Sequence, residues 1–310
     1  MARTSACGAR LLVDSVGIRL RSDRTVLEVR GEDRVGWLNG QITNDIRALK
    51  PGEAIYALAT TVKGKVLADL WVAATKDALL GFLPAMAAQA VIESFDKYLV
   101  MEEVELVPRN DLGVICLQGP AAARMIDTLP KHSEHYPCDD LGTGGYYVLC
   151  PRESAHPVMR ELAQQARGLS GGQVQECDWE LARVRLGVPE FGADFDLDNY
   201  PQEAGLARAL SFSKGCYLGQ EVVCMLDSRG RVHRRLARLT LRIDGSGALP
   251  AAGEALQDEQ GKTAGRLTSV VRDPETGEGL AFGYVKSAAE REGSTLRAGQ
   301  AQVRVGAVVA

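Results

Sequence analysis

The chain has 310 residues, of which 45% are apolar and 25% are charged, a composition typical of a folded globular protein of two or more domains. Its 36 basic and 40 acidic residues give a net charge of −4, which argues against direct binding to a nucleic-acid backbone. No apolar run approaches the roughly 18 residues of a membrane span, and the first residues lack the apolar core of a secretory signal. We therefore expect a cytoplasmic protein with no membrane partner.

The cysteines do not form a recognisable framework. The seven of them are odd in number and contain no C-x-x-C pair, and only four histidines accompany them. This pattern argues against a disulfide scaffold and predicts no metal site within the chain.

The first predicted elements are a strand, a glycine turn and a helix. Residues 24–31 alternate as in a strand, and Asp33 occupies the N-cap position of a helix that carries Trp37 and Ile42 on one face. The same order recurs at 114–126, with glycine again following the strand. This repetition predicts an internal duplication, with two related α+β halves.

Further elements follow in chain order. Residues 53–61 and 65–73 predict a β-hairpin, 77–83 a third strand, and 84–100 a helix opened by proline. Residues 145–150 predict a strand, and 157–168 and 179–187 predict helices.

The pattern changes near residue 235. Short β-rich runs separated by Gly, Pro and Asp turns occupy the remainder of the chain, which is typical of a small antiparallel barrel. We expect an α+β region at 1–235, in two halves, and a C-terminal β-barrel domain at 236–310.

One string carries most of the functional information: Ser213-Lys-Gly-Cys-Tyr-Leu-Gly-Gln-Glu221. If Cys216 stands at a helix start beside Lys214, the helix dipole and the ammonium would both favour the thiolate. The alternative is that Cys216 is a small buried apolar residue and the glycines only shape a turn. We favour the functional interpretation.

This string resembles the signature K-G-C-Y-x-G-Q-E of the YgfZ-type folate-binding proteins, relatives of the glycine-cleavage T-protein (the aminomethyltransferase GcvT). Residues 40–45 are similar to the family's Q-x-T-N-D segment, and 63–70 to its K-G-(R/K)-x-x-x-D hairpin. Pro201-Gln202 and the helix end at 185–189 also agree. The resemblance implies duplicated ferredoxin-like halves and a C-terminal barrel around a folate-binding opening.

The resemblance further implies that the protein binds tetrahydrofolate and supports iron–sulphur enzymes, including tRNA-modifying ones, or proteins that assemble their clusters. Cys216 and Asp69 are then the candidate catalytic residues. The candidate cofactor-binding residues are Asn44, Asp45, Lys63, Lys65, Lys214, Tyr217, Gln220 and Glu221. Amides, carboxylates and an aromatic ring suit a pterin, and lysines suit its glutamate tail. Asn44-Asp45 could instead cap a turn, and the two hairpin lysines could instead be solvated.

Two rival functions remain open. An aminomethyltransferase commonly has two acids in the hairpin, whereas this chain has Ala68 and Asp69, and it has a pterin-binding Glu where Arg185 stands here. A guanidinium only donates hydrogen bonds and cannot replace that carboxylate. The second rival is a scaffold without chemistry, in which Cys216 contacts a partner. The arginine-rich run 229–242 predicts a solvated face rather than an RNA contact, because it has no interleaved aromatic residues.

Overall fold

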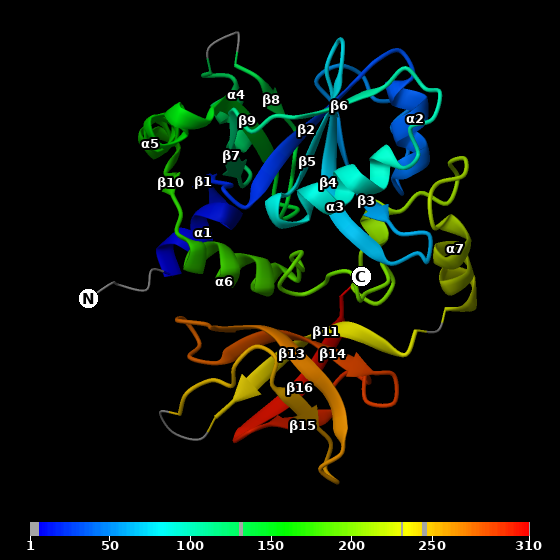
Figure 1. Ribbon diagram of the computed structural model, residues 1–310. Coiled ribbons are helices and arrows are strands. Elements are labelled where there is room, and N and C mark those ends of the chain that lie inside the picture. Colours follow the sequence, from blue (N-terminus) through cyan, green and yellow to red (C-terminus); the bar gives the residue numbers. More distant parts are fainter. Residues whose placement is uncertain (1–5, 130–132, 231, 244–246, 310) are drawn as a thin grey trace. The chain divides into compact units, whose positions relative to one another are not determined.

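The computed structural model describes residues 6–129, 133–230, 232–243 and 247–309 (Figure 1). Two compact units are present. One comprises Cys7–Gln175 and Arg208–Gln220, and the other includes Glu176–Ala207 and Glu221–Ala310. The short segment 208–220, which contains most of the signature string, therefore packs with the N-terminal residues.

The first unit contains two five-stranded sheets. One sheet has the order β3-β4-β5-β2-β6 and is antiparallel at each of its pairings. Its strands are β2 (Arg24–Arg30), β3 (Ala54–Thr60), β4 (Val66–Ala74), β5 (Leu79–Pro84) and β6 (Glu105–Pro108). Every residue of β4 is buried, which explains its nearly unbroken apolar sequence.

The other sheet of this unit has the order β10-β1-β7-β9-β8, with β1 and β10 parallel and the remaining pairs antiparallel. Its strands are β1 (Gly17–Leu20), β7 (Leu112–Gln118), β8 (His135–Tyr136), β9 (Gly145–Pro151) and β10 (Gly172–Gln173). The helical segments of the unit are α1 (Ala6–Asp14), α2 (Arg34–Gln41), η1 (Ala85–Ala87), α3 (Ala88–Asp96), α4 (Ala122–Ile126), η2 (Arg152–Ser154), α5 (Ala155–Ala166) and η3 (Arg167–Leu169).

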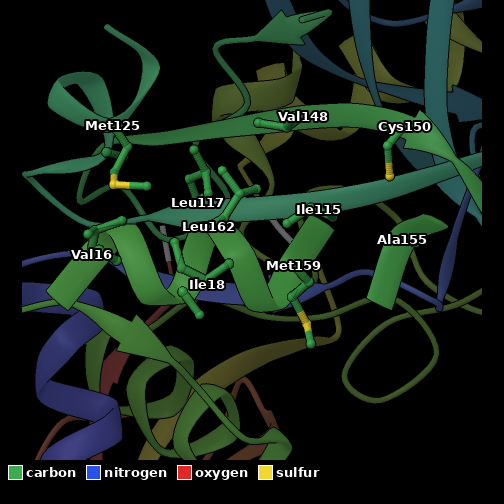
Figure 2. Close-up of a cluster of buried hydrophobic side chains, with 13 residues drawn as sticks. Val16, Ile18, Ile115, Leu117, Met125, Val148, Cys150, Ala155, Met159 and Leu162 are labelled. Carbon is green, nitrogen blue, oxygen red and sulfur yellow. The ribbon is translucent and has the colours of Figure 1, made fainter. Parts of the chain in front are cut away.

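Helix α5 covers this second sheet through an amphipathic face. Met159 and Leu162 of the helix belong to one buried hydrophobic cluster with strand residues such as Ile115 and Leu117, which Figure 2 labels. All four side chains are buried. Burial of each such side chain contributes about 1.5–3 kcal/mol, so this contact forms a core for the second half of the unit.

The two halves repeat the strand-glycine-helix order that the sequence predicts. Gly31 follows β2 with φ +104°, and Gly119 follows β7 with φ +128°. A Cβ atom at Gly31 would lie 1.8 Å from the carbonyl oxygen of Glu103, and one at Gly119 would lie 2.4 Å from that of Ser15. Both turns therefore require glycine, for its positive φ and for the close approach of another backbone segment.

The second unit contains a closed antiparallel barrel of six strands in the order β11-β14-β13-β12-β15-β16. Its strands are β11 (Arg234–Arg242), β12 (Ala255–Gln257), β13 (Thr263–Arg272), β14 (Gly279–Lys286), β15 (Thr295–Ala298) and β16 (Ala301–Val308). Helix α6 (Glu176–Leu186) packs on β13 and β14 of this barrel. The short segment η4 (Ala207–Ala209) and helix α7 (Gln220–Arg229) cross the boundaries between the two units.

Several expectations from the sequence need correction in detail. The helix expected at 84–100 is a 3-10 turn followed by α3, which ends at Asp96. Asp33 does stand at the N-cap of α2, but its carboxylate accepts a hydrogen bond from the backbone N–H of Glu103 rather than capping the helix. Within the described ranges, no helix has both the length and the apolar composition needed to cross a membrane.

Candidate functional site

Three of the motif segments noted in the sequence meet in the first unit. The segment 214–219, called here the thiol loop, packs against residues 40–45 and against the hairpin turn 61–65. The backbone N–H of Leu218 donates to the carbonyl oxygen of Gly40 at 3.0 Å, and the hydroxyl of Thr60 donates to the carbonyl oxygen of Leu218. Segments whose bonded residues lie 158 or more positions apart in the sequence therefore form one structure around Cys216.

Thr43 links residues 209–211, which precede the thiol loop, to strand β3. Its hydroxyl donates to the carbonyl oxygen of Ala209 at 2.6 Å and accepts a hydrogen bond from the N–H of Leu58 at 2.9 Å. Its own carbonyl oxygen accepts from the N–H of Ser211 at 3.0 Å. The threonine of the Q-x-T-N-D segment therefore has a structural role, and its hydroxyl both donates and accepts a hydrogen bond within the protein.

Lys214 is buried, and its ammonium donates three hydrogen bonds to backbone carbonyl oxygens. The acceptors are Asn39 at 2.6 Å, Ile42 at 2.7 Å and Asn44 at 2.8 Å. Burial lowers the pKa of Lys214 to about 8, although the nearby charge of Asp45 acts in the opposite direction. All three donors of the ammonium are occupied by backbone carbonyl oxygens of the protein itself. The expected contact between Lys214 and the folate stays a prediction.

Cys216 and Tyr217 lie on opposite sides of the loop surface. Cys216 is exposed, while the Tyr217 ring is buried with the Lys214 ammonium 5.4 Å from its centroid. Helix α7 begins only at Gln220, so the condition under which a helix dipole would favour the Cys216 thiolate, a place at the helix start, is not met. The Lys214 side chain is directed inward to its carbonyl acceptors. The conformation of the loop leaves the Cys216 thiol accessible.

Asp69 lies in β4 and is only 3% exposed. The Arg24 guanidinium grips both of its carboxylate oxygens, at 2.8 and 3.2 Å, and the Tyr56 hydroxyl donates to one of them at 3.0 Å. Burial, together with this carboxylate, holds the pKa of Tyr56 well above its usual value. Asp69 is therefore a paired carboxylate in the interior, in an environment unlike that of the exposed Cys216.

A second buried carboxylate, Asp140, extends this polar network. It accepts hydrogen bonds from the Arg21 guanidinium at 2.5 Å, from the Trp71 indole at 2.9 Å and from the Tyr147 hydroxyl at 2.7 Å. The sequence analysis did not identify this group. The one available signal is that arginines stand at the edge of an otherwise apolar strand region, at 21 and 24, where a buried acid would have to meet them.

Asn44 and Asp45 form a turn with its own partners. The Asn44 amide donates to the carbonyl oxygen of Tyr56 at 2.9 Å and accepts from the N–H of Asp45 at 3.0 Å. Asp45 pairs with Arg47 at 2.6 Å, and hydrogen bonds from Arg47 lower the pKa of Asp45 to about 2. Their contacts match the turn-forming alternative, and their assignment to a pterin stays a prediction.

The remaining expected cofactor residues lie nearer to solvent. Lys63 is exposed and Lys65 is half-buried in the hairpin turn, whereas Gln220 is half-buried and Glu221 exposed in the first turn of α7. Within the described residues, the side chains of Lys63, Gln220 and Glu221 make no hydrogen bond or ion pair, so these groups are available to a ligand. Their roles stay predictions, and Glu221 belongs to the unit that carries the barrel.

Two buried side-chain oxygens of the motif segments, those of Gln41 and Gln202, lack a hydrogen-bond partner in the described structure. The side-chain oxygen of Gln41, at the end of α2, is buried and accepts no hydrogen bond in the described structure. Such an atom is costly unless a donor reaches it. The exocyclic amino group and ring N–H of a pterin are donors of this kind, so the residues present fit a folate, and sequence reasoning did not single out Gln41 for this part.

Arg183 and Arg185 of α6 lie in the segment where the chain departs from the aminomethyltransferase pattern. Arg183 is buried and pairs with Asp194 at 2.6 Å, while Arg185 pairs with Asp273 of the barrel unit at 2.6 Å. Arg185 therefore holds the helix against the turn that follows β13. The carboxylate expected at this place in the transferase is absent, and an ion pair within the second unit replaces it.

Comparisons with known proteins agree with this organisation. The sequence profile of the GCVT N-terminal domain matches residues 8–137, and that of the glycine cleavage T-protein C-terminal barrel domain matches residues 234–310. The chain is 26% identical over 275 residues to the tRNA-modifying protein YgfZ of Yersinia pseudotuberculosis, covering 84% of this chain and 81% of that protein.

Two further proteins are similar. A putative chloroplastic transferase of Arabidopsis thaliana is 25% identical over 88% of this chain, but the match spans only 66% of the relative's length, just under two thirds. The crystal structure of the glycine cleavage system aminomethyltransferase T from Bartonella henselae superimposes with a TM-score of 0.83 at 21% identity, over 97% of this chain and 87% of that one. That likeness establishes the α+β fold with its C-terminal barrel. The chain belongs to the glycine-cleavage T-protein family, as a relative of its YgfZ-type members.

Proposed function

We propose that this protein binds tetrahydrofolate in the cytoplasm and supports iron–sulphur enzymes, including tRNA-modifying ones, through the thiol of Cys216. The family, and the similarity to the tRNA-modifying protein YgfZ, support the link to tRNA modification. The observation that carries the proposal is the thiol loop, where three motif segments converge to hold one cysteine at the surface.

The surroundings of the other cysteines strengthen the assignment to Cys216. Burial raises the pKa of Cys116, Cys138 and Cys150, which are enclosed in the first unit and are poor thiolates. Cys177 is exposed, but it lies at the start of α6 and outside the motif segments. Cys224 is half-buried within α7. Among the cysteines with described side chains, Cys216 is both exposed and within the thiol loop, which suits exchange with a partner protein.

The folate part of the proposal rests on donors and acceptors near the same motifs. The buried oxygen of Gln41 needs a donor, and Lys63 offers a free ammonium to a carboxylate tail. When bound, tetrahydrofolate would supply one-carbon chemistry at its ring nitrogens. The chain would contribute binding and orientation through these groups.

Calorimetric titration of the full chain with tetrahydrofolate tests this part, with Gln41→Leu as the matched variant. We expect saturable binding by the wild type and an affinity at least about fivefold weaker in the variant, because a lost hydrogen bond to a buried acceptor costs about 1–3 kcal/mol. The midpoint of unfolding should not fall, since the substitution removes a buried polar atom that has no partner in the protein. Absence of saturable binding by the wild type would refute the folate claim.

The aminomethyltransferase alternative has its own test. Incubation with aminomethyl-lipoyl carrier protein and tetrahydrofolate should release no ammonia, because Asp69 is held by Arg24 and Tyr56 in the interior. Catalytic ammonia release would replace the proposal with a transferase function. A protein that neither binds folate nor depends on Cys216, yet retains its partners in a pull-down, would instead be a scaffold.

A further inference from the structure

The thiol loop is anchored on both sides of Cys216. Two residues before the cysteine, the Lys214 ammonium is bonded to the carbonyl oxygens of Asn39, Ile42 and Asn44. Two residues after it, Leu218 is bonded through its N–H to Gly40 and through its carbonyl oxygen to Thr60. Cys216 is thus exposed at the middle of a short span whose two ends are fixed to the same body.

The Lys214 ammonium is unusual because it is a buried charge whose hydrogen-bond partners are backbone carbonyl oxygens. Its side chain is buried, and no carboxylate lies within ion-pair distance of its ammonium in the described structure. The nearest charges that affect it are Asp45 and Arg47, which pair with each other. The three acceptors come from the last turn of α2 and the turn that follows it, where helix carbonyls lack helical partners.

We propose that Lys214 is a positioning residue, which sets the conformation of the thiol loop by binding these three carbonyl oxygens, and that it does not contact the folate. The functional consequence for the thiol rests on the role proposed above for Cys216. The geometric claim stands independently of that role and of folate binding.

These three carbonyl oxygens, called here the carbonyl cage, favour lysine over other cations. An ammonium is a compact donor of three bonds that can diverge toward three acceptors, whereas a guanidinium is a planar fork that suits carboxylates. Removing the ammonium leaves three partly buried carbonyl oxygens without this donor. The loop should then separate from residues 39–44 on its Lys214 side, while the bonds of Leu218 to Gly40 and Thr60 still hold its other side.

Hydrogen exchange of the full chain, measured by mass spectrometry on peptides covering 211–220, tests the proposal. We expect exchange at least about tenfold faster in Lys214→Met than in the wild type, with strand β13 of the barrel unchanged as an internal reference. Lys63→Met removes an exposed lysine of the neighbouring hairpin and should leave the loop as in the wild type. Lys214→Arg should exchange like Lys214→Met, because its fork does not fit the cage.

Two additional measurements keep the proposal falsifiable if Lys214→Met folds poorly. Lys214→Ala leaves room for the missing side chain, and added n-propylammonium should restore slow exchange in that variant but not in Lys63→Met. Tetrahydrofolate affinity should stay within about twofold of the wild type in Lys214→Ala with the amine bound. A wild-type rate of hydrogen exchange in Lys214→Met, or in Lys214→Arg, would overturn the proposal that the carbonyl cage positions the loop. A large loss of folate affinity in the amine-rescued variant would return Lys214 to the ligand site.

Discussion

At the scale of single residues, the sequence identified Asp69 as important but could not show what holds it. The residue type and its place in the hairpin motif predicted a carboxylate at a folate. The structure places that carboxylate between Arg24 and Tyr56, inside the first unit. Its partners come from β2 and β3, and no spacing rule relates them to Asp69 in the sequence. Long-range pairing of this kind depends on sheet order, which single-residue patterns do not contain.

We expect Arg24→Met to destabilise the protein by about 3–5 kcal/mol, because it leaves the Asp69 carboxylate buried without its cation. Urea unfolding followed by circular dichroism measures this change. Arg30→Met is the control, since Arg30 pairs with Glu28 at the surface and its removal should shift the midpoint little. Equal effects of the two substitutions would show that burial does not govern the Arg24 pair.

The buried tyrosines predict a loss of stability at alkaline pH. Burial raises the pKa of Tyr136 to about 12, and it also raises the pKa of Tyr56 and Tyr147 well above the usual value. A pKa higher in the folded state than in the unfolded state gives stability that is full below about pH 10 and lost as the pH rises toward 12 and beyond. Tyr136 alone should account for about 2 kcal/mol at pH 12.

The measurement is the urea midpoint between pH 8 and pH 12, for the wild type and for Tyr136→Phe. The two curves should run parallel below pH 10, and the wild type should fall more steeply above it. Curves that stay parallel to pH 12 would mean that Tyr136 ionises as readily in the folded protein as in the unfolded chain.

At the scale of elements, the strands and helices with clear periodicity were predictable, and the joints between them were not. The hairpin of β3 and β4 and the duplicated turns at Gly31 and Gly119 follow from local sequence. The meeting of the thiol loop with residues 40–45 and with the hairpin turn does not, because it depends on hydrogen bonds between residues that lie 158 or more positions apart. Helix α7, which begins at Gln220, is one of the two options, helix or strand, that the sequence left open from Glu221 onward.

Gly219 is the joint between the thiol loop and the hairpin. It has φ +80°, and a Cβ atom there would lie 2.3 Å from the carbonyl oxygen of Thr61 and 3.1 Å from Gly64. Gly219→Ala should therefore displace the loop from the hairpin, with a cost of about 1–3 kcal/mol from the backbone conformation alone. We expect faster hydrogen exchange of 214–219 and a lower urea midpoint.

Gly215→Ala is the matched control within the same string. A Cβ atom at Gly215 would meet no heavy atom within 4 Å, and its backbone does not require a positive φ. This variant should retain wild-type exchange and stability. If Gly219→Ala behaved in the same way, the loop would not depend on close packing against the hairpin.

At the scale of the whole molecule, the change of pattern near residue 235 marks the approach to the barrel, whose first strand begins at Arg234. Contacts nevertheless group α6 with the barrel through pairs such as Arg185–Asp273, and group 208–220 with the N-terminal unit. Sequence composition cannot reveal such exchanges, because a helix that packs on a barrel and one that packs on a sheet share the same amphipathic pattern. The division at 235 therefore stays a proposal about domains.

The central claim is that this protein supports iron–sulphur enzymes through Cys216. The most direct measurement is the activity of such enzymes in cells that lack the protein and carry either Cys216→Ala or Cys177→Ala at wild-type abundance. Cys177 is the matched control, since it is also exposed but lies outside the thiol loop. We expect that Cys177→Ala restores the activity of these enzymes and that Cys216→Ala does not. Full restoration by Cys216→Ala would contradict the proposed role of the Cys216 thiol.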